Sequence, residues 1–390
     1  MDVGDYPKTP FGEARRTPGA HGYVAFFPAR LPRRLSLSTA TVRLLTEAES
    51  ALGRLAGVGQ LIPNPHLLMQ PYLLREALAS TRVEGTEASM TDLYEFGASG
   101  GVPSPDIEEV LNYIEAIEWG LGQLETLPVS LRLLREMHGR LRAAVRGRDR
   151  RPGELRTSQN WIGGAGSTIE SARFVPPPPD VLGDLLTDWE QFANDDLELP
   201  LLVQDALLHY QFETLHPFLD GNGRLGRLMI VFFLVARGRL PAPLLYLSSY
   251  LERDRQRYYE ALQAPRETGD IEPWIMLFLE AVQTQAVDAV YRAHRILELR
   301  ERYRTAASAS RSRNLTALAD LVCERPILTA RLVMERLGVT RPTSISLLRQ
   351  LSGLGVLTEQ SSGPRGQLRY VADELLAALS DDVDARSPLN

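Results

Sequence analysis

One short stretch of the chain, residues 216–227, combines side chains that are suited to phosphate chemistry. It reads His-Pro-Phe-Leu-Asp-Gly-Asn-Gly-Arg-Leu-Gly-Arg. His216 can accept a proton near neutral pH, which is what a general base does. Asp220 offers the hard oxygen ligand that Mg2+ prefers. The stretch therefore supplies both a proton acceptor and a candidate metal ligand.

The second half of the stretch is suited to holding an anion. Gly221, Asn222 and Gly223 leave the backbone unobstructed just before an apolar helical pattern, so free N–H groups can point at a phosphate. Arg224 and Arg227 are three residues apart and share one helix face. With the base and the metal ligand, these features predict a phosphoryl- or nucleotidyl-transfer site.

Two other interpretations of this stretch fit less well. Residues 221–226 also match the dinucleotide fingerprint G-x-G-x-x-G, which needs a preceding strand and an acidic residue about twenty positions later. A helical pattern precedes the motif at 201–215, and no carboxylate follows it up to residue 249. His209 and His216 are seven apart without a third ligand at metal-site spacing, so we interpret His209 as structural.

The stretch resembles the signature of the Fic family, His-x-Phe-x-[Asp/Glu]-Gly-Asn-Gly-Arg-x-x-Arg, and meets every fixed position. The resemblance implies that His216 deprotonates a Tyr, Thr or Ser hydroxyl, which then attacks the α-phosphate of ATP. It also implies that Asp220 holds Mg2+ and that the backbone around Asn222 binds phosphates. Arg224 and Arg227 would bind the β- and γ-phosphates.

A segment upstream, Ser80-Thr81-Arg82-Val83-Glu84-Gly85, resembles the inhibitory motif [Ser/Thr]-x-x-x-Glu-[Gly/Asn] of many Fic proteins. In that reading Ser80, Glu84 and Gly85 form a brake on a helix beside the active site. A carboxylate paired with Arg227 would occupy the group that should receive the γ-phosphate. The alternative is an ordinary solvated helix end.

Two further segments resemble parts of a Fic site. Residues 255–259 resemble the segment that borders adenine and ribose, so Tyr258 and Tyr259 are candidates to stack on the nucleoside or hydrogen-bond it; the alternative is that both are core aromatics. Residues 160–175 predict a short β-hairpin that resembles the flap over the site. Its edge could pair with an extended target segment, or it could be purely structural.

The elements that must position these residues are mainly helical. Apolar residues recur at helical spacing in 37–96, in two segments from 106 to about 146, and from 180 to about 306. The first thirty or so residues show no period and predict an extended arm. We expect a mainly α protein, with a Fic-type helical bundle, a small β-hairpin flap and a C-terminal winged helix-turn-helix domain. The expected divisions are 1–105 (arm and inhibitory helix), 106–305 (catalytic core) and 312–380 (winged helix).

The C-terminal region resembles a winged helix. Helices are expected at 315–323, 330–337 and 341–351, followed by two strands within 355–371, and 306–314 has linker composition. The third helix and the wing offer polar and basic groups for duplex DNA: Arg341, Thr343, Ser344, Ser346, Arg349, Gln350, Arg365 and Arg369. Winged helices also dock proteins or dimerise, so the sequence leaves DNA, a protein partner and a homodimer open.

Bulk properties narrow the class of protein. The chain has 390 residues, 44% of them hydrophobic and 24% charged, with a net charge of −6, which is typical of a globular protein and not of one coated with basic charge. Cys323 stands alone, which excludes an intrachain disulfide and a cysteine-based zinc site. Neither a signal peptide nor a long apolar run is apparent, so we expect a cytoplasmic protein without a membrane partner.

The leading hypothesis is an autoinhibited protein adenylyltransferase that moves AMP from Mg-ATP to a hydroxyl of a target protein or of itself. One alternative is a DNA-binding transcriptional regulator whose Fic core senses nucleotide. Another keeps the fold and changes the reaction, because some relatives transfer phosphocholine or phosphate, or remove AMP. The same anion-binding loop would serve all of these reactions.

Overall fold

The computed structural model describes residues 1–19, 22–61, 66–99, 102–143, 151–164, 166–310, 312–362 and 367–380. In these parts the helices are α1 (Thr39–Leu61), α2 (His66–Val83), α3 (Met90–Ser99), α4 (Pro105–Gln123), α5 (Leu131–Leu141), α6 (Leu182–Asn194), α7 (Leu201–Leu215), α8 (Asn222–Ala236), α9 (Ser248–Arg253), α10 (Arg255–Glu267), α11 (Glu272–Ser308), α12 (Arg313–Glu324), α13 (Ala330–Leu337), α14 (Arg341–Gly353) and α15 (Asp373–Ser380). The strands are β1 (Gly12–Arg16), β2 (Val24–Pro28), β3 (Ile327–Leu328), β4 (Thr358–Ser362) and β5 (Gln367–Val371). The mainly helical fold that the sequence predicted is confirmed.

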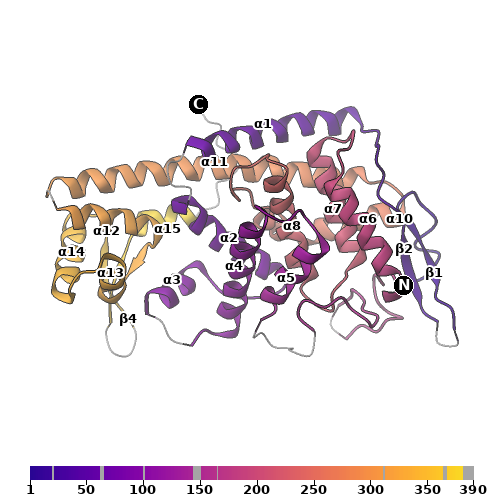
Figure 1. Ribbon diagram of the computed structural model, residues 1–390, viewed down its shortest axis with the longest axis horizontal. Helices are drawn as coiled ribbons and strands as arrows, with labels where there is room; N and C mark the ends of the chain where they lie inside the picture. The colour runs from indigo at the N-terminus through magenta and orange to yellow at the C-terminus, as the bar shows by residue number, and fades with distance from the viewer. Residues whose placement is uncertain are drawn as a thin grey trace.

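Helix α11 is the spine of the molecule. Its 37 residues extend for about 55 Å at 1.5 Å per residue, and it runs beneath α1 from the C-terminal helices to the N-terminal strands (Figure 1). Glu272, in its first turn, accepts hydrogen bonds from the Ser38 amide (2.6 Å) and the Thr41 hydroxyl (2.7 Å), which fixes the start of α1 against the start of α11. One continuous apolar core follows this spine and includes residues from Phe11 to Leu379.

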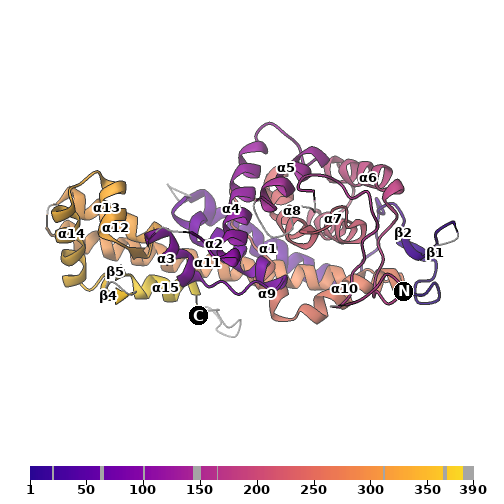
Figure 2. The same cartoon turned by 90° about the horizontal axis from the view of Figure 1, so that it is seen from below.

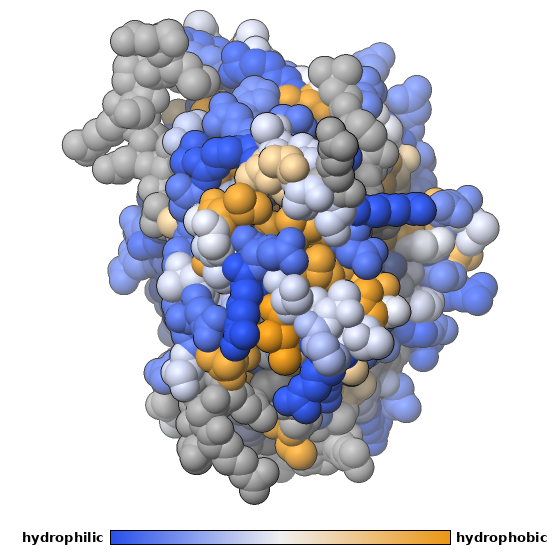
Figure 3. All heavy atoms as spheres, turned by 90° about the vertical axis from the view of Figure 1, so that its left-hand side faces the viewer, coloured by the Kyte–Doolittle hydropathy of each residue, from blue (hydrophilic) through white to orange (hydrophobic). Residues whose placement is uncertain are grey.

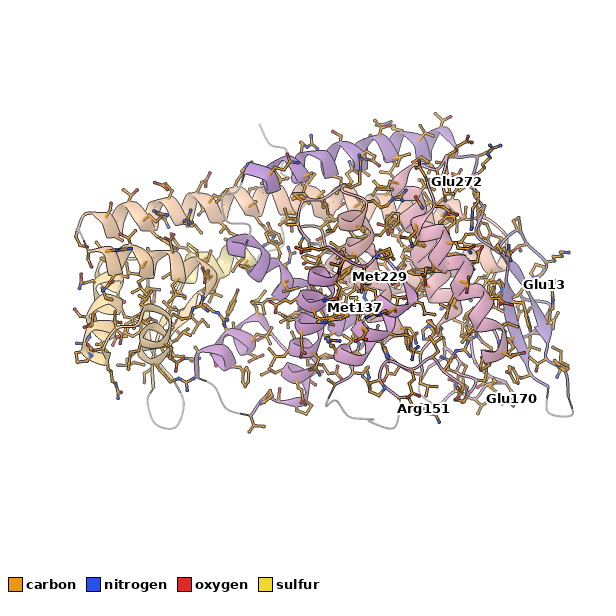
Figure 4. The ribbon with its side chains drawn as sticks, in the orientation of Figure 1. Glu13, Met137, Arg151, Glu170, Met229 and Glu272 are labelled. Carbon is orange, nitrogen blue, oxygen red and sulfur yellow. The ribbon has the colours of Figure 1, made fainter. Side chains whose placement is uncertain are left out.

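Helices α7 and α8 lie at the centre of the largest cluster of helices, as the view from below shows (Figure 2). Leu202 to Leu215 are all buried, so α7 has no solvent face and its polar residues must find partners inside the protein. Met137 of α5 and Met229 of α8 fill part of the interior beside them (Figure 4). This burial fixes the loop that joins α7 to α8, where the predicted motif lies.

The N-terminal segment differs from the expected arm. Residues Gly12–Arg16 and Val24–Pro28 pair as an antiparallel hairpin in which Gly12 faces Pro28 and Arg16 faces Val24. Ala14 and Phe26 turn toward Phe174 and form a small apolar cluster with it. The prediction of an extended arm was wrong because these short strands are stabilised by a distant segment, which their local pattern does not reveal.

The predicted flap at 160–175 is present as a folded-back loop with little strand character. Ile162 and Phe174 form one antiparallel bridge, in which each amide donates to the other carbonyl (2.8 and 3.1 Å). The short hairpin that the sequence predicted is thus reduced to this single bridge, because the intervening Ser and Thr residues bond within their own turn. Ser171 accepts from the Thr168 amide at 2.9 Å, for example.

The C-terminal elements follow the predicted order, helix, helix, turn, helix, hairpin. The structure adds β3, which pairs with β5 in a sheet of order β3-β5-β4, and it adds α15. Two expectations for this region were wrong. The segment 306–314 is not a plain linker, since α11 continues to Ser308. Ser344 is fully buried and donates to the Arg341 carbonyl, because it lies on the inner face of α14. Arg365 lies outside the described residues.

Among the residues that the structure describes, no helix is both long enough and apolar enough to span a bilayer.

Candidate active site

The predicted motif forms the loop between α7 and α8. His216 ends α7 in the left-handed conformation (φ 46°, ψ 59°), and its amide donates to the Phe212 carbonyl at 3.0 Å. Gly221 precedes α8 with φ 77°, a value that suits glycine. The loop therefore leaves one helix and enters the next through two left-handed residues, which turns its side chains toward one cavity.

Side chains that the sequence analysis did not single out hold this loop. Arg156 donates from Nε to the His216 carbonyl (2.9 Å), and its own amide donates to the Pro217 carbonyl (2.9 Å). The Nδ2 of Asn160 donates to the Phe218 carbonyl at 2.9 Å. Burial lowers the pKa of Arg156 to about 10, which still leaves it charged at neutral pH. In the sequence, only the run of polar residues after Gly153 could have indicated that this segment contacts the loop.

Asn222 has a structural task within the loop. Its side chain accepts from the Phe218 amide (2.9 Å) and donates to the Phe218 carbonyl (2.8 Å). The ring of His138 stacks on Phe218, with centroids 3.9 Å apart, and Nε2 of His138 lies 2.9 Å from the Asp220 carbonyl. The side-chain amide of Asn222 therefore holds the loop in shape, which leaves the backbone N–H groups of the loop to bind an anion.

A cavity of about 520 Å³ opens over this loop. Nine of the predicted residues line it: Glu84, His216, Asp220, Gly221, Asn222, Gly223, Arg227, Tyr258 and Tyr259. The structure does not place Arg224, Ser80 or Gly85 in this lining. Trp161 and Phe174 of the predicted flap also line the cavity, and so do Glu213 and Arg266, which were not predicted. Its size suits a nucleotide-sized ligand.

His216 is positioned as a neutral base. Burial, followed by the charge of Arg156, lowers its pKa to about 4, so the imidazole is unprotonated near pH 7. A neutral imidazole can take a proton, whereas an imidazolium cannot. The ring therefore meets the first requirement of the role that the sequence suggested.

Arg227 is held by the segment that resembles an inhibitory motif. Its Nε donates to the Ser80 hydroxyl (3.0 Å), and one terminal nitrogen donates to the Ser80 carbonyl (2.8 Å) and to Oε1 of Glu84 (2.9 Å). Burial alone would lower the pKa of Arg227, but the charge and hydrogen bond of Glu84, together with Tyr258 and Tyr113, raise that pKa. The guanidinium is thus occupied in this structure.

The Glu84 carboxylate also covers the start of α8. A Cβ on Gly223 would lie 2.5 Å from Oε1 of Glu84, so the carboxylate rests directly on the first turn of that helix. The first amides of a helix have no intrahelical acceptor, and the helix dipole favours an anion there. Glu84 therefore lies where an incoming phosphate would be attracted.

Comparison with known proteins agrees with this geometry. The description "Fic/DOC family N-terminal" matches residues 42–122, and the description "Fic/DOC family" matches residues 128–234. The chain belongs to the Fic/DOC family.

Curated relatives carry the name protein adenylyltransferase. One such Fic protein, of Drosophila willistoni, is 28% identical over 162 residues, 41% of this chain and 29% of that protein. A probable protein adenylyltransferase of Aquifex aeolicus is 32% identical over 99 residues, 25% of this chain and 28% of that protein. The matched part thus spans less than a third of each relative.

Solved structures show the same fold. A Fic family protein from Desulfovibrio desulfuricans G20 superposes with a TM-score of 0.55 at 21% identity and covers 87% of this chain and 97% of its own. Fic-1 from C. elegans superposes with a TM-score of 0.51 at 20% identity, covering 65% of this chain and 72% of its own. At these identities the likeness concerns the fold.

The acidic residue of the Fic loop, Asp220, is balanced by arginines. Its Oδ2 lies 3.1 Å from Arg142 and its Oδ1 lies 3.8 Å from Arg224, which in turn reaches Glu109 at 3.4 Å. Arg224 is therefore turned from Arg227 toward α4, although both lie on α8. No group of three or more His, Cys, Asp or Glu side chains forms a metal site within the described residues.

Asp220 fits Mg2+ only in one mode of binding. Mg2+ is often held by one or two carboxylates together with substrate phosphates and water. Asp220 supplies a single, partly exposed carboxylate at the cavity, next to the loop that would receive phosphates. The residues present therefore fit a metal that arrives with its nucleotide.

The two tyrosines of the Fic core differ in their freedom. Tyr258 is buried, and its hydroxyl lies 2.9 Å from Nε2 of His209, whose Nδ1 lies 3.1 Å from the Gly226 carbonyl. Burial lowers the pKa of His209 to about 3, in keeping with a structural histidine. Tyr259 is 42% exposed and offers its ring to the cavity rim. Tyr258 can thus present only its ring to a nucleoside, whereas Tyr259 can present both its ring and its hydroxyl.

Proposed function

We propose that this chain is an autoinhibited protein adenylyltransferase that transfers AMP from Mg-ATP to a hydroxyl of a protein. The observation that carries the proposal is the placement of neutral His216, the amide-rich start of α8 and the Glu84–Arg227 pair around one cavity. A base, an anion site and an occupied phosphate ligand are the parts that such a reaction and its inhibition need.

The reaction would proceed by in-line displacement. His216 takes the proton of a Ser, Thr or Tyr hydroxyl as that oxygen bonds to the α-phosphorus of ATP. The bond from the α-phosphorus to the bridging oxygen breaks, and pyrophosphate leaves with the electron pair. The first amides of α8 and Arg227 would hold the phosphates, and Asp220 would hold Mg2+, which neutralises phosphate charge when bound.

Inhibition would follow from competition for Arg227. A carboxylate and a γ-phosphate cannot share the guanidinium and the start of α8, since both are anions. The Glu84 side chain is 38% exposed whereas that of Arg227 is 2% exposed, so Glu84 is the partner with open space into which its side chain could turn. ATP would bind with its phosphates displaced until α2 moves or Glu84 swings away.

The test removes the carboxylate. Glu84→Gly should raise incorporation of label from α-labelled ATP into the protein itself by at least tenfold, because each ~1.4 kcal/mol of lost inhibitory coupling is tenfold. Arg227→Ala should be inactive because the phosphate ligand is lost as well. The double variant should match Arg227→Ala, as expected for two residues that act through one contact.

Glu87→Gly is a matched control, since this exposed carboxylate lies three residues further along and makes no hydrogen bond or ion pair with Arg227. An unchanged rate in folded Glu84→Gly would contradict the proposed brake. Intact-mass spectrometry after incubation with Mg-ATP separates AMP transfer from transfer of phosphate. The same measurement on AMP-modified protein reveals removal of AMP.

A second candidate activity is duplex DNA binding by the C-terminal region, with or without catalysis in the core. Arg341 and Arg349 are exposed on α14, and no carboxylate of the described residues lies within ion-pair distance of either. They border a shallow groove of about 670 Å³ with Ser346 and Gln350. Figure 3 shows this end of the molecule, where hydrophilic residues surround small apolar patches.

One predicted DNA contact is already engaged. Arg369 of β5 pairs with Glu95 of α3, so this arginine holds the sheet against the N-terminal helices. The wing expected to present it is therefore turned toward the core at this position. Among the described residues, the exposed arginines predicted to contact DNA are Arg341 and Arg349 of α14.

Fluorescence anisotropy of a labelled duplex with the full chain tests this candidate. Affinity should fall steeply as salt rises, by a slope of about 0.9 for each phosphate neutralised. Arg341→Ala with Arg349→Ala should weaken binding and reduce the slope. Arg336→Ala serves as a control because that side chain is paired with Glu324 at 2.8 Å. No binding at low salt would favour a protein-docking role.

A further inference from the structure

Glu213 lies one helical turn before His216 and shares its cavity wall. Its carboxylate oxygen Oε2 is 3.9 Å from Nδ1 of His216. Nδ1 of His216 and Oε1 of Glu213 are both buried and have no hydrogen-bond partner among the described residues. Buried polar atoms are nearly always paired. The unpaired Oε1 and the nearer Oε2 belong to one carboxyl group, so a small rotation of that group can give Nδ1 a partner.

The packing of α8 accommodates this carboxyl group. A Cβ on Gly226 would lie 2.4 Å from Oε1 of Glu213, so a larger residue would push the carboxyl out of its position. The hydroxyl of Tyr258, another wall of the cavity, is taken by His209. The carboxyl group of Glu213 is therefore confined beside the imidazole and makes no hydrogen bond to any other described side chain.

Charged and polar groups from several elements affect the protonation of His216. Arg156 and Arg266 disfavour its protonated form, whereas Glu84 and the Glu213 backbone carbonyl favour it. Burial raises the pKa of the Glu213 carboxyl to about 7, with Arg227 and Arg266 opposing the rise and Glu84 adding to it. Near neutral pH the imidazole is thus unprotonated, and about half of the Glu213 carboxyl groups are ionised and able to accept a hydrogen bond.

We infer that Glu213 is a positioning residue that accepts a hydrogen bond from Nδ1–H of His216 and so presents Nε2 as the base. The catalytic part of this inference rests on the proposed function. Shortening the separation of Nδ1 and Oε2 by about 1 Å gives an ordinary N–H···O bond. Such a small rotation accompanies substrate binding in many sites.

The proton balance is simple. The hydroxyl proton of the acceptor moves to Nε2 of His216 as the oxygen–phosphorus bond forms and pyrophosphate leaves. Nδ1 keeps its proton throughout, and the Glu213 carboxylate faces the imidazolium that results. A carboxylate stabilises that cation, as it does in other base–orienter pairs.

Nitrogen-15 NMR of the imidazole groups tests the pair without any catalysis. The chain has 6 histidines, and His216→Gln identifies the signals of His216 by their loss. In the parent protein Nδ1 should carry the proton. Glu213→Gln should keep this tautomer, because the Gln oxygen still accepts, but should lower the pH at which His216 becomes protonated. Glu213→Ala should lose the tautomer preference.

Glu76→Gln is the matched control. Glu76 is buried on α2, and burial raises its pKa to about 7 as it does for Glu213. Its carboxyl group accepts hydrogen bonds from the Tyr113 hydroxyl (2.8 Å) and the Ser248 amide (3.3 Å), and it makes no hydrogen bond or ion pair with His216. This variant should leave the signals and the titration of His216 unchanged.

Kinetics supply the second readout, with all variants in the Glu84→Gly background. Glu213→Gln should lower kcat about 10- to 100-fold, the range found when a partner behind a functional histidine is removed, and should leave the KM for ATP unchanged. Glu213→Asp should recover part of the loss. The inference would be overturned if the parent and Glu213→Gln showed the same tautomer and the same titration of His216. The Nδ1–H of His216 would then be assigned as the donor to the Glu213 backbone carbonyl. Absence of AMP transfer in Glu84→Gly would instead contradict the proposed function, while the NMR comparison still decides the pair.

Discussion

The conformation of His216 is held by residues far from it in sequence. A non-glycine residue in the left-handed region costs on the order of 1–3 kcal/mol, so its surroundings must stabilise it. Arg156 donates to the His216 carbonyl at 2.9 Å and Asn160 does so at 3.3 Å. The motif itself contains the proposed base, but the groups that hold its backbone lie about sixty residues upstream.

The first prediction at this scale concerns His216 as base. In the Glu84→Gly background, His216→Ala should lower AMP transfer at least ~100-fold, because general-base catalysis contributes that much or more. ATP binding, measured by calorimetry, should stay nearly constant because the imidazole acts on the hydroxyl. His294→Ala, an exposed histidine on α11, should change neither quantity. Comparable labelling by His216→Ala would show that another group is the base.

At the scale of elements, the approach of α7 and α8 determines the site. Gly226 permits that approach, since a Cβ there would meet Oε1 of Glu213 at 2.4 Å and the Phe212 ring at 3.0 Å. Polar groups then lie inside a packed helix pair, where burial shifts their pKa values. The close contact of these two helices is thus part of the chemistry of the site.

Gly226→Ala should therefore destabilise the protein by about 1–3 kcal/mol, the usual cost of overpacking. The midpoint of urea unfolding measures it. Gly53→Ala is the matched control, because Gly53 lies inside α1 with nothing within 4 Å of an added Cβ. That change should stabilise by roughly 0.5–1 kcal/mol through helix propensity. Equal midpoints for the two variants would contradict the close contact.

The sequence predicted elements whose signals are local and missed those that depend on distant partners. Helix α13 was predicted at its observed bounds, because caps and apolar spacing mark both of its ends. The β1–β2 hairpin was missed because its buried Phe26 packs on Phe174, a neighbour only in three dimensions. The contact of Arg224 with Glu109 was missed for the same reason, since helical spacing indicates a shared face and says nothing of what that face meets.

At the scale of the whole molecule, α11 joins the catalytic helices to the C-terminal ones. Leu299, Tyr303 and Ala307 of its last turns are buried, and α12 packs along this part of the spine. Asp320 of α12 adds an ion pair with Arg300 at 2.9 Å. The composition of 306–314 suggested a linker, yet the helix continues because its inner face is covered.

A fragment of residues 312–380 should accordingly be less stable than one that begins at residue 272. The shorter fragment exposes the apolar face of α12, whereas the longer one retains its partner on α11. Circular dichroism during heating should show a lower midpoint, or no cooperative transition, for the shorter fragment. Equal midpoints would mean that the C-terminal elements fold without the spine.

The pairing of Glu84 with Arg227 joins two residues of one polypeptide. Dilution cannot weaken such a contact, because the local concentration of one group near the other is set by the fold and not by the number of molecules in solution. Under the proposed inhibition, a cell that makes very little of this protein and one that makes a great deal would have the same fraction of molecules with Glu84 bound to Arg227. Release would then require an event at each molecule, such as a partner or a modification that draws α2 away, and loss of a separate inhibitor protein could not substitute for it.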